Sequence, residues 1–449
     1  MPVVFPCEQG LHEFSEWRLS SRYAKSKTHF PRLPPRVGRC RIALSDFTGR
    51  FAAASLCCRK TGTGKTTLLK NLFLELARSG HGVALLDPHG DLADSLLDLL
   101  PRRDAARVIY FNPSDLSHPL AWNIVADVPS DERPTVAAGV VSAFKNVWVD
   151  SWGPRLEYIL YNAIRALLDA EHTTLLGLSK MLTNDAYRAW VVRQIEDPFV
   201  KAFWTEEFEG YDQRFRQEAI APIQNKIGAL VTNPVLRNMV GQVKRKLDIP
   251  FIMNSGRIFI ANLSKGAIGD IPSNLIGSLL VSEFQRAAMT RSAMPESDRR
   301  DFSLIIDEFQ NFTTGAFASI LSEARKFRLS LVLSHQFTSQ LQPAVRDAVF
   351  GNVGTSIAFH IGFSDAELLA KEYAGAFAPS HFVDLERFHI LVKPCAIDGP
   401  EQPFRGKTLA CDAPITGSKN AILRSSRKRY ANDRATVEEK LRRWMERWG

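Results

Sequence analysis

The feature that most constrains the fold is a glycine-rich run that leads directly into an apolar helix over residues 68–77. The run consists of Thr61, Gly62, Thr63, Gly64, Lys65, Thr66 and Thr67. Glycine lets a backbone curl around a phosphate chain so that its N–H groups point at the oxygens. In such a loop Lys65 reaches the β- and γ-phosphates, the Thr66 hydroxyl binds Mg²⁺, and the helix dipole favours the anion. The run therefore predicts the phosphate-binding loop, or P-loop, of an α/β nucleotide-binding domain.

The entry to this loop departs from the usual pattern. The pattern G-x-x-x-x-G-K-[ST] places a glycine at position 59, where this chain has Arg59. Residues 51–58 (FAAASLCC) are rich in alanine and cysteine, and we expect them to make a poor buried strand. Residues 1–50 are rich in serine, arginine and proline without periodicity, so they are expected to be disordered or extended. These features raise the hypotheses that residues 1–58 are not native and that Arg59 affects nucleotide affinity.

A second motif supports the P-loop. Residues 304–306 (LII) predict an apolar strand that ends in Asp307 and Glu308. A P-loop ATPase needs carboxylates at a strand end to hold Mg²⁺ and to activate the attacking water. Found together, the two motifs decide against an ordinary glycine turn before a helix. Residues 83–87 predict a further strand that ends in DPHGD (residues 87–91), where α/β sheets build sites, although spacing alone favours a plain turn there.

The remaining apolar segments predict the architecture. Strand and helix patterns alternate over residues 52–125 and again over 257–393, as in parallel strands joined by helices. Residues 130–245 between them contain long amphipathic helical segments. We expect an α/β fold of the P-loop NTPase class, RecA-like, with a mostly parallel sheet flanked by helices and an inserted all-α domain. The predicted divisions are 1–50, 51–128 and 251–400 (the two parts of the nucleotide-binding domain), 129–250 (the helical domain) and 401–449 (a basic tail with a helix over 436–448).

Positive charge is concentrated at the two ends of the chain. Residues 1–60 carry 11 Lys and Arg against 4 Asp and Glu, and residues 416–449 carry 10 against 4, so the two ends carry +13 and the rest of the chain about −4 of the overall +9. Basic ends fit a nucleic-acid partner, and the tail is expected to carry part of any DNA affinity with a steep salt dependence. Solvated tails without a partner fit the charge equally well. In the helical part, Trp148, Trp152, Tyr158 and Tyr161 favour core packing over stacking on DNA bases.

Neither a membrane span nor a zinc site is expected from the sequence. No run approaches the roughly 18 apolar residues of a spanning helix, and the start lacks the apolar core of a signal peptide. The six cysteines show neither C-x-x-C nor Cys/His spacing. They are interpreted as reduced thiols, and the protein is expected to be cytoplasmic, with the inner face of the membrane as a place to which it can be recruited.

Two further polar residues complete a pattern that is typical of one family. Gln336 follows the apolar strand over residues 329–334, where it can contact a γ-phosphate or orient water, and Arg325 lies on the helix before it. For an isolated arginine on a helix, a surface charge is the usual interpretation. Yet the motifs in order (residues 61–67, 87–91, LIIDEFQ, SEARKF and SHQFTSQL) resemble those of the conjugative coupling ATPases of type IV secretion. They also resemble the wider HerA–FtsK group of DNA-pumping ring motors, over about residues 60–400.

The resemblance implies an ATP-hydrolysing DNA translocase that moves DNA through a ring in conjugative-type transfer. It implies ATP and Mg²⁺ as cofactors, DNA as the substrate, a homo-hexamer, and secretion-channel or relaxosome partners. The implied roles are the P-loop lysine for Lys65, magnesium ligands for Thr66 and Asp307, the water-activating base for Glu308, the γ-phosphate sensor for Gln336, and for Arg325 the arginine that enters a neighbouring subunit's site. Asp87 falls on the family's acidic strand-end position, whose role stays open.

Because the chain departs from the family's pattern, two alternative functions are considered. Coupling proteins typically carry N-terminal membrane helices and HerA-type motors an N-terminal barrel, and residues 1–50 predict neither. A factor that binds ATP without cycling and tethers or recruits DNA is therefore a second hypothesis, which Arg59 favours. The intact set of Asp307, Glu308, Gln336 and Arg325 counts against it, since tethering does not require them. A phage-type packaging ATPase would be expected to bring a nuclease domain, and no acidic cluster for one stands out.

Overall fold

One sheet carries both the strand before the P-loop and the strand that ends in the acidic pair, with a single strand between them. The computed structural model describes residues 62–313, 317–395 and 402–448, together with the backbone of the short strands β1 (Val3–Val4), β2 (Arg41–Ile42) and β3 (Ala53–Cys57). Strands β1 and β2 pair with each other as a separate ribbon. The other strands are β4 (Gly82–Asp87), β5 (Val108–Phe111), β6 (Ile258–Asn262), β7 (Phe302–Ile306), β8 (Leu329–His335), β9 (Thr355–Ala358), β10 (His389–Lys393) and β11 (Phe404–Lys407).

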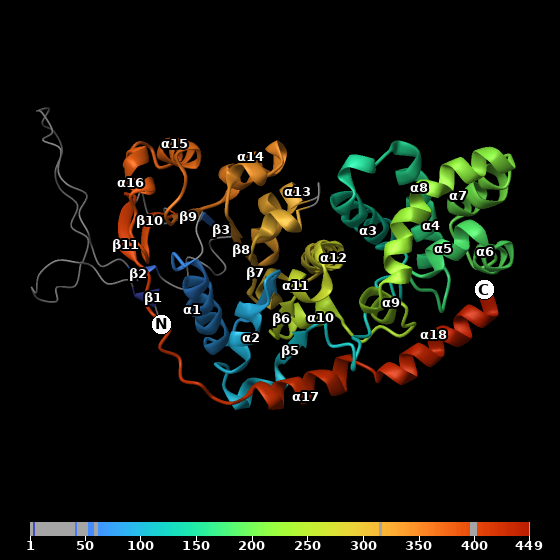
Figure 1. Ribbon diagram of the computed structural model, residues 1–449, viewed down its shortest axis with the longest axis horizontal. Coiled ribbons are helices and arrows are strands. Elements are labelled where there is room, and N and C mark those ends of the chain that lie inside the picture. Colours follow the sequence, from blue (N-terminus) through green and yellow to red (C-terminus); the bar gives the residue numbers. More distant parts are fainter. Residues whose placement is uncertain are drawn as a thin grey trace, which may run out of the picture.

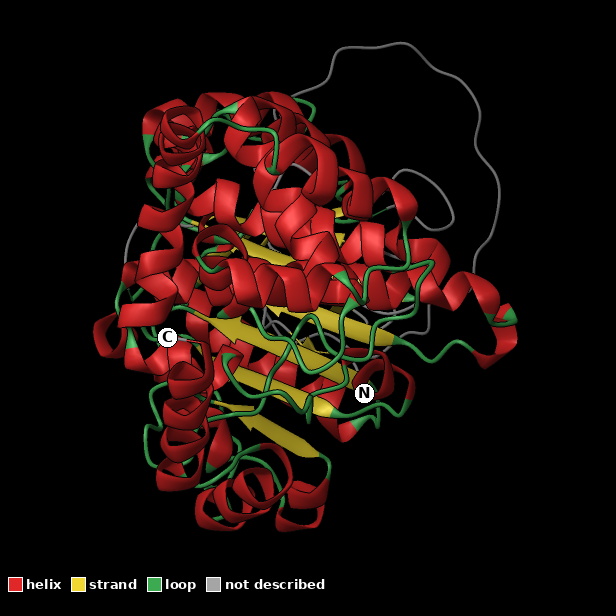
Figure 2. Ribbon diagram, turned by 90° about the vertical axis from the view of Figure 1, so that its right-hand side faces the viewer, coloured by secondary structure: helices red, strands yellow, loops and turns green. Residues whose placement is uncertain are grey.

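The sheet has the order β11-β10-β9-β3-β8-β7-β4-β6-β5 (Figure 1). From β9 to β5 all neighbouring strands are parallel, and β10 and β11 continue the sheet antiparallel at one edge. Helices lie on both sides of it, so that the strands are enclosed between helical layers (Figure 2). The predicted fold class, a mostly parallel α/β sheet flanked by helices, is therefore confirmed.

The expectation of a poor strand over residues 51–58 is wrong for its central part. β3 forms over Ala53–Cys57 and lies inside the sheet, with Ala54 opposite Val332 on β8 and opposite Thr355 on β9. Backbone pairing on both sides favours an extended conformation that the residues' own propensities do not, because strand propensity depends strongly on context. The strand ends just before the P-loop, so it fixes where that loop leaves the sheet.

Two apolar layers bury the two faces of the sheet. In β4, alternate side chains point to opposite faces, and all six residues are buried. Val83 and Leu85 pack with α1 (Lys65–Arg78) and α2 (Asp91–Leu97). Ala84 and Leu86 belong to the larger core on the other face, which includes α12 (Asp270–Met289). Burial on both faces is why these strands are continuously apolar in sequence.

Helices follow one another between β5 and β6, where the sequence predicts an inserted helical domain. The main ones are α3 (Arg133–Val147), α4 (Pro154–Asp169), α5 (Gly177–Thr183), α6 (Asp185–Val192), α7 (Pro198–Ala202), α8 (Gln213–Thr232), α9 (Pro234–Val240) and α10 (Ile249–Asn254). Trp148, Trp152 and Tyr161 are partly buried against the core, and Tyr158 keeps 48% of its surface exposed. Packing thus accounts for three of the four aromatic residues that the sequence places together.

Further helices lie in the chain between β6 and β10. They are α11 (Lys265–Ile268), α13 (Phe317–Glu323), α14 (Pro343–Asn352), α15 (Phe363–Glu372) and α16 (Pro379–Val383). A 3-10 helix, η8 (Ala324–Phe327), follows α13 and carries Arg325. In the part of the chain that the structure describes, no helix combines the length and the apolar character needed to cross a membrane.

The C-terminal segment differs from the predicted loop and single helix. It contains β11 and two helices, α17 (Lys419–Tyr430) and α18 (Arg434–Trp448). The sequence did not indicate α17. Only Ile422 and Ser426 are buried in this helix, and its other residues are mostly charged or polar, so no apolar periodicity marks it. The Ser426 hydroxyl donates to the backbone oxygen of Tyr110 on β5, and Trp448 packs edge-on against Tyr187 of α6. The two helices therefore run along the sheet and on to the helical part (Figure 1).

Candidate nucleotide-binding site

The P-loop turn depends on two glycines in the left-handed region. Gly62 has φ +80° and Gly64 has φ +114°, a conformation that side chains rarely adopt. Helix α1 begins at Lys65, and the N–H of Leu68 donates to the backbone oxygen of Gly64 at 2.9 Å. The N–H groups of the first helical turn have no carbonyl partner within the helix, so this end of α1 suits an anion. The predicted P-loop residue Thr61 and the irregular Arg59 lie outside the described residues.

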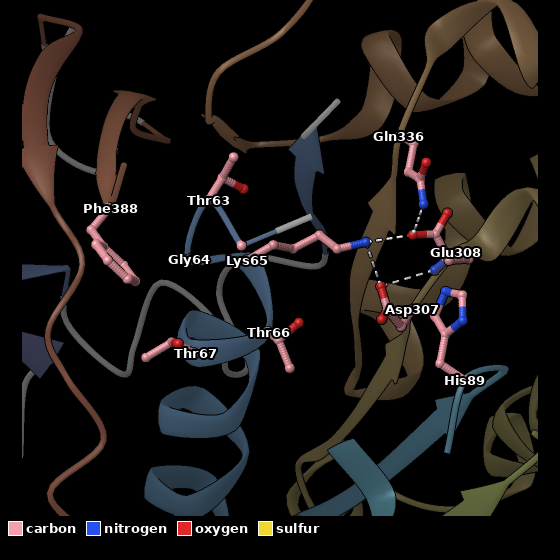
Figure 3. Close-up of a pocket in the computed structure, with 11 residues that line it drawn as sticks. Thr63, Gly64, Lys65, Thr66, Thr67, His89, Asp307, Glu308, Gln336 and Phe388 are labelled. Carbon is pink, nitrogen blue, oxygen red and sulfur yellow. Dashed lines mark hydrogen bonds and ion pairs between the residues drawn. The ribbon is translucent and has the colours of Figure 1, made fainter. Parts of the chain in front are cut away.

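A cavity of about 300 Å³ opens beside this turn (Figure 3). Its lining brings the P-loop together with the predicted acidic and amide residues, from strands far apart in sequence. It consists of Gly62, Thr63, Gly64, Lys65, Thr66, Thr67, His89, Asp307, Glu308, Gln336 and Phe388. Asp307 and Glu308 follow β7, and Gln336 follows the neighbouring β8. The carboxyl ends of parallel strands meet at one edge of the sheet, which is why these residues converge.

The Lys65 ammonium lies between the two carboxylates. Its Nζ is 2.6 Å from Glu308 Oε1 and 2.9 Å from Asp307 Oδ1. Burial alone would lower the pKa of Lys65, but the two carboxylates outweigh it and raise this pKa above its usual value. Lys65 is therefore charged at neutral pH and directed toward the acidic end of the cavity. The Asp307 and Glu308 carboxylates bind the Lys65 ammonium in this structure, and phosphate oxygens of a bound nucleotide can replace them as its partners.

Glu308 is held in a constrained conformation. Its φ of +48° lies in the left-handed region, which is uncommon for a residue other than glycine and occurs often at functional sites. Oε1 accepts a hydrogen bond from Gln336 Nε2 at 2.9 Å, and Oε2 accepts one from Gln310 Nε2 at 2.7 Å. Burial would raise the pKa of Glu308, but Lys65 and the two amides outweigh it and lower that pKa, so Glu308 is an anion able to accept a proton.

The donors in the cavity suit Mg²⁺ bound to phosphates. Asp307 Oδ1 accepts from the Ser334 hydroxyl at 2.8 Å and from the Glu308 N–H at 3.0 Å, which fixes the carboxylate at the cavity wall. The Thr66 hydroxyl and the Asp307 carboxylate are hard oxygen ligands of the kind Mg²⁺ prefers. A Cβ added at Gly64 would lie 3.0 Å from Phe388 Cδ1 and from Thr408 Oγ1, so any other residue there would crowd these two side chains. The residues present therefore fit a triphosphate with its metal ion.

Asp87 has a structural role in this molecule, a point that the sequence left open. Its carboxylate is fully buried and accepts from the backbone N–H groups of His89 and Ala93, both at 2.9 Å. Burial raises the pKa of Asp87 even though these N–H groups favour its charged form. The carboxylate holds the turn before α2, and this turn presents His89 to the cavity.

His89 and Phe388 line the cavity although no role was predicted for them. His89 belongs to the DPHGD run, so the sequence contained a signal, and the plain-turn interpretation obscured it. Phe388 precedes β10 and carried no signal, because nothing in its surroundings in sequence indicates a neighbour of the P-loop. Arg325 is exposed on η8 and is not among the residues that line the cavity of its own chain.

The stability of the fold is expected to depend on pH through His335, the last residue of β8. Its side chain is buried and packs edge-on against Phe309, with ring centroids 5.5 Å apart. Burial lowers the pKa of His335 to about 4. Between about pH 6.5 and pH 4 the unfolded chain binds a proton that the folded chain does not, so stability falls as the pH falls.

From pH 7.5 to 5.0 this single group is expected to remove about 2 kcal/mol of unfolding free energy. Urea unfolding at the two pH values, for the wild type and His335→Asn, measures the difference. The variant should lose less stability on acidification, and His172→Asn, at an exposed histidine, should behave as the wild type. An identical pH dependence in all three proteins would mean that His335 does not titrate in this window.

The fold and the cavity define a P-loop NTPase core. Residues 54–207 match the family model described as the type IV secretion-system coupling protein DNA-binding domain. No curated protein matches the sequence. The motif resemblance to coupling ATPases of type IV secretion is thereby confirmed by an independent comparison.

Solved structures show the same fold over most of the chain. The unbound conjugative coupling protein TrwBdeltaN70 has a TM-score of 0.60 at 15% identity, covering 83% of this chain and 88% of that chain. The plasmid coupling protein TrwB in complex with the ATP analogue ADPNP has a TM-score of 0.59 at 15% identity, with the same two coverages. VirB4 of Thermoanaerobacter pseudethanolicus has a TM-score of 0.52 at 15% identity, covering 84% of this chain and 94% of that chain.

Proposed function

We propose that this protein is an ATP-driven DNA translocase of the coupling type, working as a homo-hexameric ring. The observation that carries the proposal is the convergence of Lys65, Asp307, Glu308 and Gln336 in one cavity beside the P-loop turn. The family-model match over residues 54–207 supports DNA as the partner. ATP and Mg²⁺ are supported by TrwB structures described in complex with ADPNP and with ADP and Mg²⁺.

The proposed chemistry divides among the residues of the cavity. Mg²⁺, when bound, neutralises charge on the phosphates and orients them. Thr66 and Asp307 would hold this ion. Lys65 would exchange its bonds to the carboxylates for phosphate oxygens, which leaves Glu308 free to accept a proton from water. Gln336 now donates to Glu308 at 2.9 Å, and its amide would donate instead to a γ-phosphate bound at Lys65, as expected of a sensor. Positioning and charge neutralisation supply most of the rate in such reactions.

Arg325 completes the proposed site from a neighbouring subunit. It is exposed and is not among the residues that line the cavity of its own chain, which supports insertion into the site of another copy. The backbone that carries it is held firmly, because Arg299 Nη1 donates to the Lys326 oxygen at 2.6 Å and Arg291 Nη1 to the Phe327 oxygen at 2.8 Å. We place the ring in the cytoplasm, where secretion-channel or relaxosome partners would recruit it to the membrane.

The first test is ATP hydrolysis by the purified protein with and without long DNA. Long DNA should stimulate hydrolysis, and Lys65→Ala should remove the stimulated activity, because Lys65 is the only lysine or arginine among the described residues that line the cavity. Lys70→Ala, at a lysine of the same helix outside the cavity, is the matched control and should retain it. Bound ATP without hydrolysis would favour the tethering hypothesis. Turnover that persists in Lys65→Ala would contradict the site.

Exposed cations of α17 are expected to contact DNA phosphates. Arg424 and Lys428 are exposed, lie one helical turn apart, and line a hollow with His118, Lys246 and Arg427. Because α17 packs on the sheet, substitutions test this better than removing the tail. Arg424→Gln with Lys428→Gln should weaken DNA binding and reduce the slope of log affinity against log salt by about 1.8, for two phosphate contacts.

Titrations with duplex DNA at several salt concentrations measure this slope. Lys371→Gln on α15, an exposed lysine at the other end of the sheet, is the control and should leave the slope unchanged. An unchanged slope in the α17 double variant would exclude this face from the DNA path.

A further inference from the structure

The cavity beside the P-loop has two chemically different ends. At one end the Lys65 side chain points toward Asp307, Glu308 and Gln336, which hold all the polar contacts drawn in Figure 3. At the other, beyond Gly64, lies the ring of Phe388. Among the described residues that line the cavity, the only large apolar side chain is that of Phe388. The cavity is therefore asymmetric along the direction in which a phosphate chain would lie.

The backbone of Phe388 is fixed to the P-loop itself. Its N–H donates to the backbone oxygen of Thr63 at 2.8 Å. Its carbonyl oxygen accepts from the N–H of Thr408 at 2.7 Å and from the Thr408 hydroxyl at 3.2 Å. The residue has φ +65°, a left-handed conformation that is uncommon and costly for a bulky side chain. Such a conformation persists only where surrounding contacts impose it, and here those contacts come from Thr63 of the phosphate-binding loop and from Thr408 directly after β11.

The ring of Phe388 covers the loop without being buried by it. A Cβ placed on Gly64 would lie 3.0 Å from Phe388 Cδ1, so the ring closely approaches the turn. Yet 41% of Phe388 remains exposed, at the mouth of a cavity lined elsewhere by polar groups. A phenylalanine that is strained, anchored and still exposed is poorly explained by core packing. Its position is better explained by a ligand that covers the ring.

We propose that Phe388 is the stacking platform for the purine base of the nucleotide, an inference that rests on the proposed function. Lys65 and the acidic end require the terminal phosphates, so the rest of the nucleotide extends past Gly64 toward Phe388. An aromatic face stacks on any base, since every base has a π-face. Among the described residues, the lining around Phe388 consists of glycines and threonines, and the longer polar side chains lie at the acidic end. The site therefore holds adenine and guanine with similar affinity.

The test separates base binding from phosphate binding. Equilibrium binding of ATP, GTP and inorganic tripolyphosphate, each with Mg²⁺, is measured by calorimetry for the full-length wild type and three variants. Phe388→Gly removes the ring and relieves the left-handed backbone, so it should not destabilise the fold through strain. Phe388→Trp keeps an aromatic face. Phe363→Ala is the control, since Phe363 is 60% exposed and is not among the residues lining the cavity.

Phe388→Gly should weaken ATP and GTP binding by a similar factor, about 5- to 150-fold, and leave tripolyphosphate binding unchanged. Phe388→Trp and Phe363→Ala should match the wild type. If Phe388→Gly lowers the melting temperature, Phe388→Leu, which keeps apolar bulk without an aromatic face, takes its place. Unchanged ATP affinity, or an equal loss of tripolyphosphate affinity, would overturn the platform while leaving the ATPase proposal intact. A wild type that binds none of the three ligands would overturn both.

Discussion

Glu308→Gln is expected to stop ATP hydrolysis while ATP still binds. The amide keeps the shape of the carboxylate, and its one oxygen can accept from either Gln310 or Gln336. The other of these two side chains can turn its own amide so that its oxygen accepts from the new NH2 group, so the cavity should keep its form. The new amide cannot accept a proton from water. Loss of a general base typically costs about 10²- to 10⁴-fold in turnover. Lys65 also loses one of its two anionic partners but keeps Asp307 at 2.9 Å, so phosphates compete for it more easily and ATP affinity should not fall.

Single-turnover hydrolysis and nucleotide binding, measured on the same preparation, check this prediction. Glu323→Gln, at the end of α13 and not among the residues lining the cavity, is the matched control and should hydrolyse ATP as the wild type does. Loss of ATP binding in Glu308→Gln would show that the carboxylate maintains the cavity structure. Hydrolysis at the normal rate would exclude Glu308 as the base.

The chemistry of the site could be predicted from the sequence because it resides in short linear motifs. The P-loop run and the strand that ends in Asp307 and Glu308 are each contiguous, and the carboxyl ends of parallel strands meet at one edge. The same reasoning places Gln336 beside Glu308, since β7 and β8 are neighbouring strands. The Gln336 amide indeed donates to the Glu308 carboxylate at 2.9 Å. Their roles in turnover remain predictions that the variants above would test.

What the sequence could not indicate depends on contacts between distant segments. β3 is extended because β8 and β9 pair with it on both sides, although its alanines and cysteine do not favour a strand. The role of Asp87 became visible only when its carboxylate was found buried among backbone N–H groups. Phe388 reaches the P-loop through a left-handed backbone, and no local pattern predicts a positive φ at a phenylalanine. Local propensity and periodicity carry no information about such contacts.

Arg325→Ala is expected to lower turnover by about 10³- to 10⁵-fold, the range known for arginines supplied by a neighbouring subunit. The side chain is exposed on η8, so its removal leaves the core intact and ATP binding to the variant's own P-loop should persist. Lys326→Ala is the control, because Lys326 is also exposed on η8 and only its backbone oxygen holds the segment in place. It should hydrolyse ATP normally.

Mixing two inactive proteins tests whether Arg325 acts on a neighbouring subunit. An Arg325→Ala subunit keeps an intact Glu308, and a Glu308→Gln subunit keeps an intact Arg325. Where the second inserts its arginine into the site of the first, one complete site forms, so mixed rings should regain part of the wild-type hydrolysis. An arginine acting within its own chain gives no such recovery, because each chain then lacks one of the two groups. Co-assembled mixtures that stay inactive at every ratio would therefore exclude Arg325 as an arginine that acts on a neighbouring subunit.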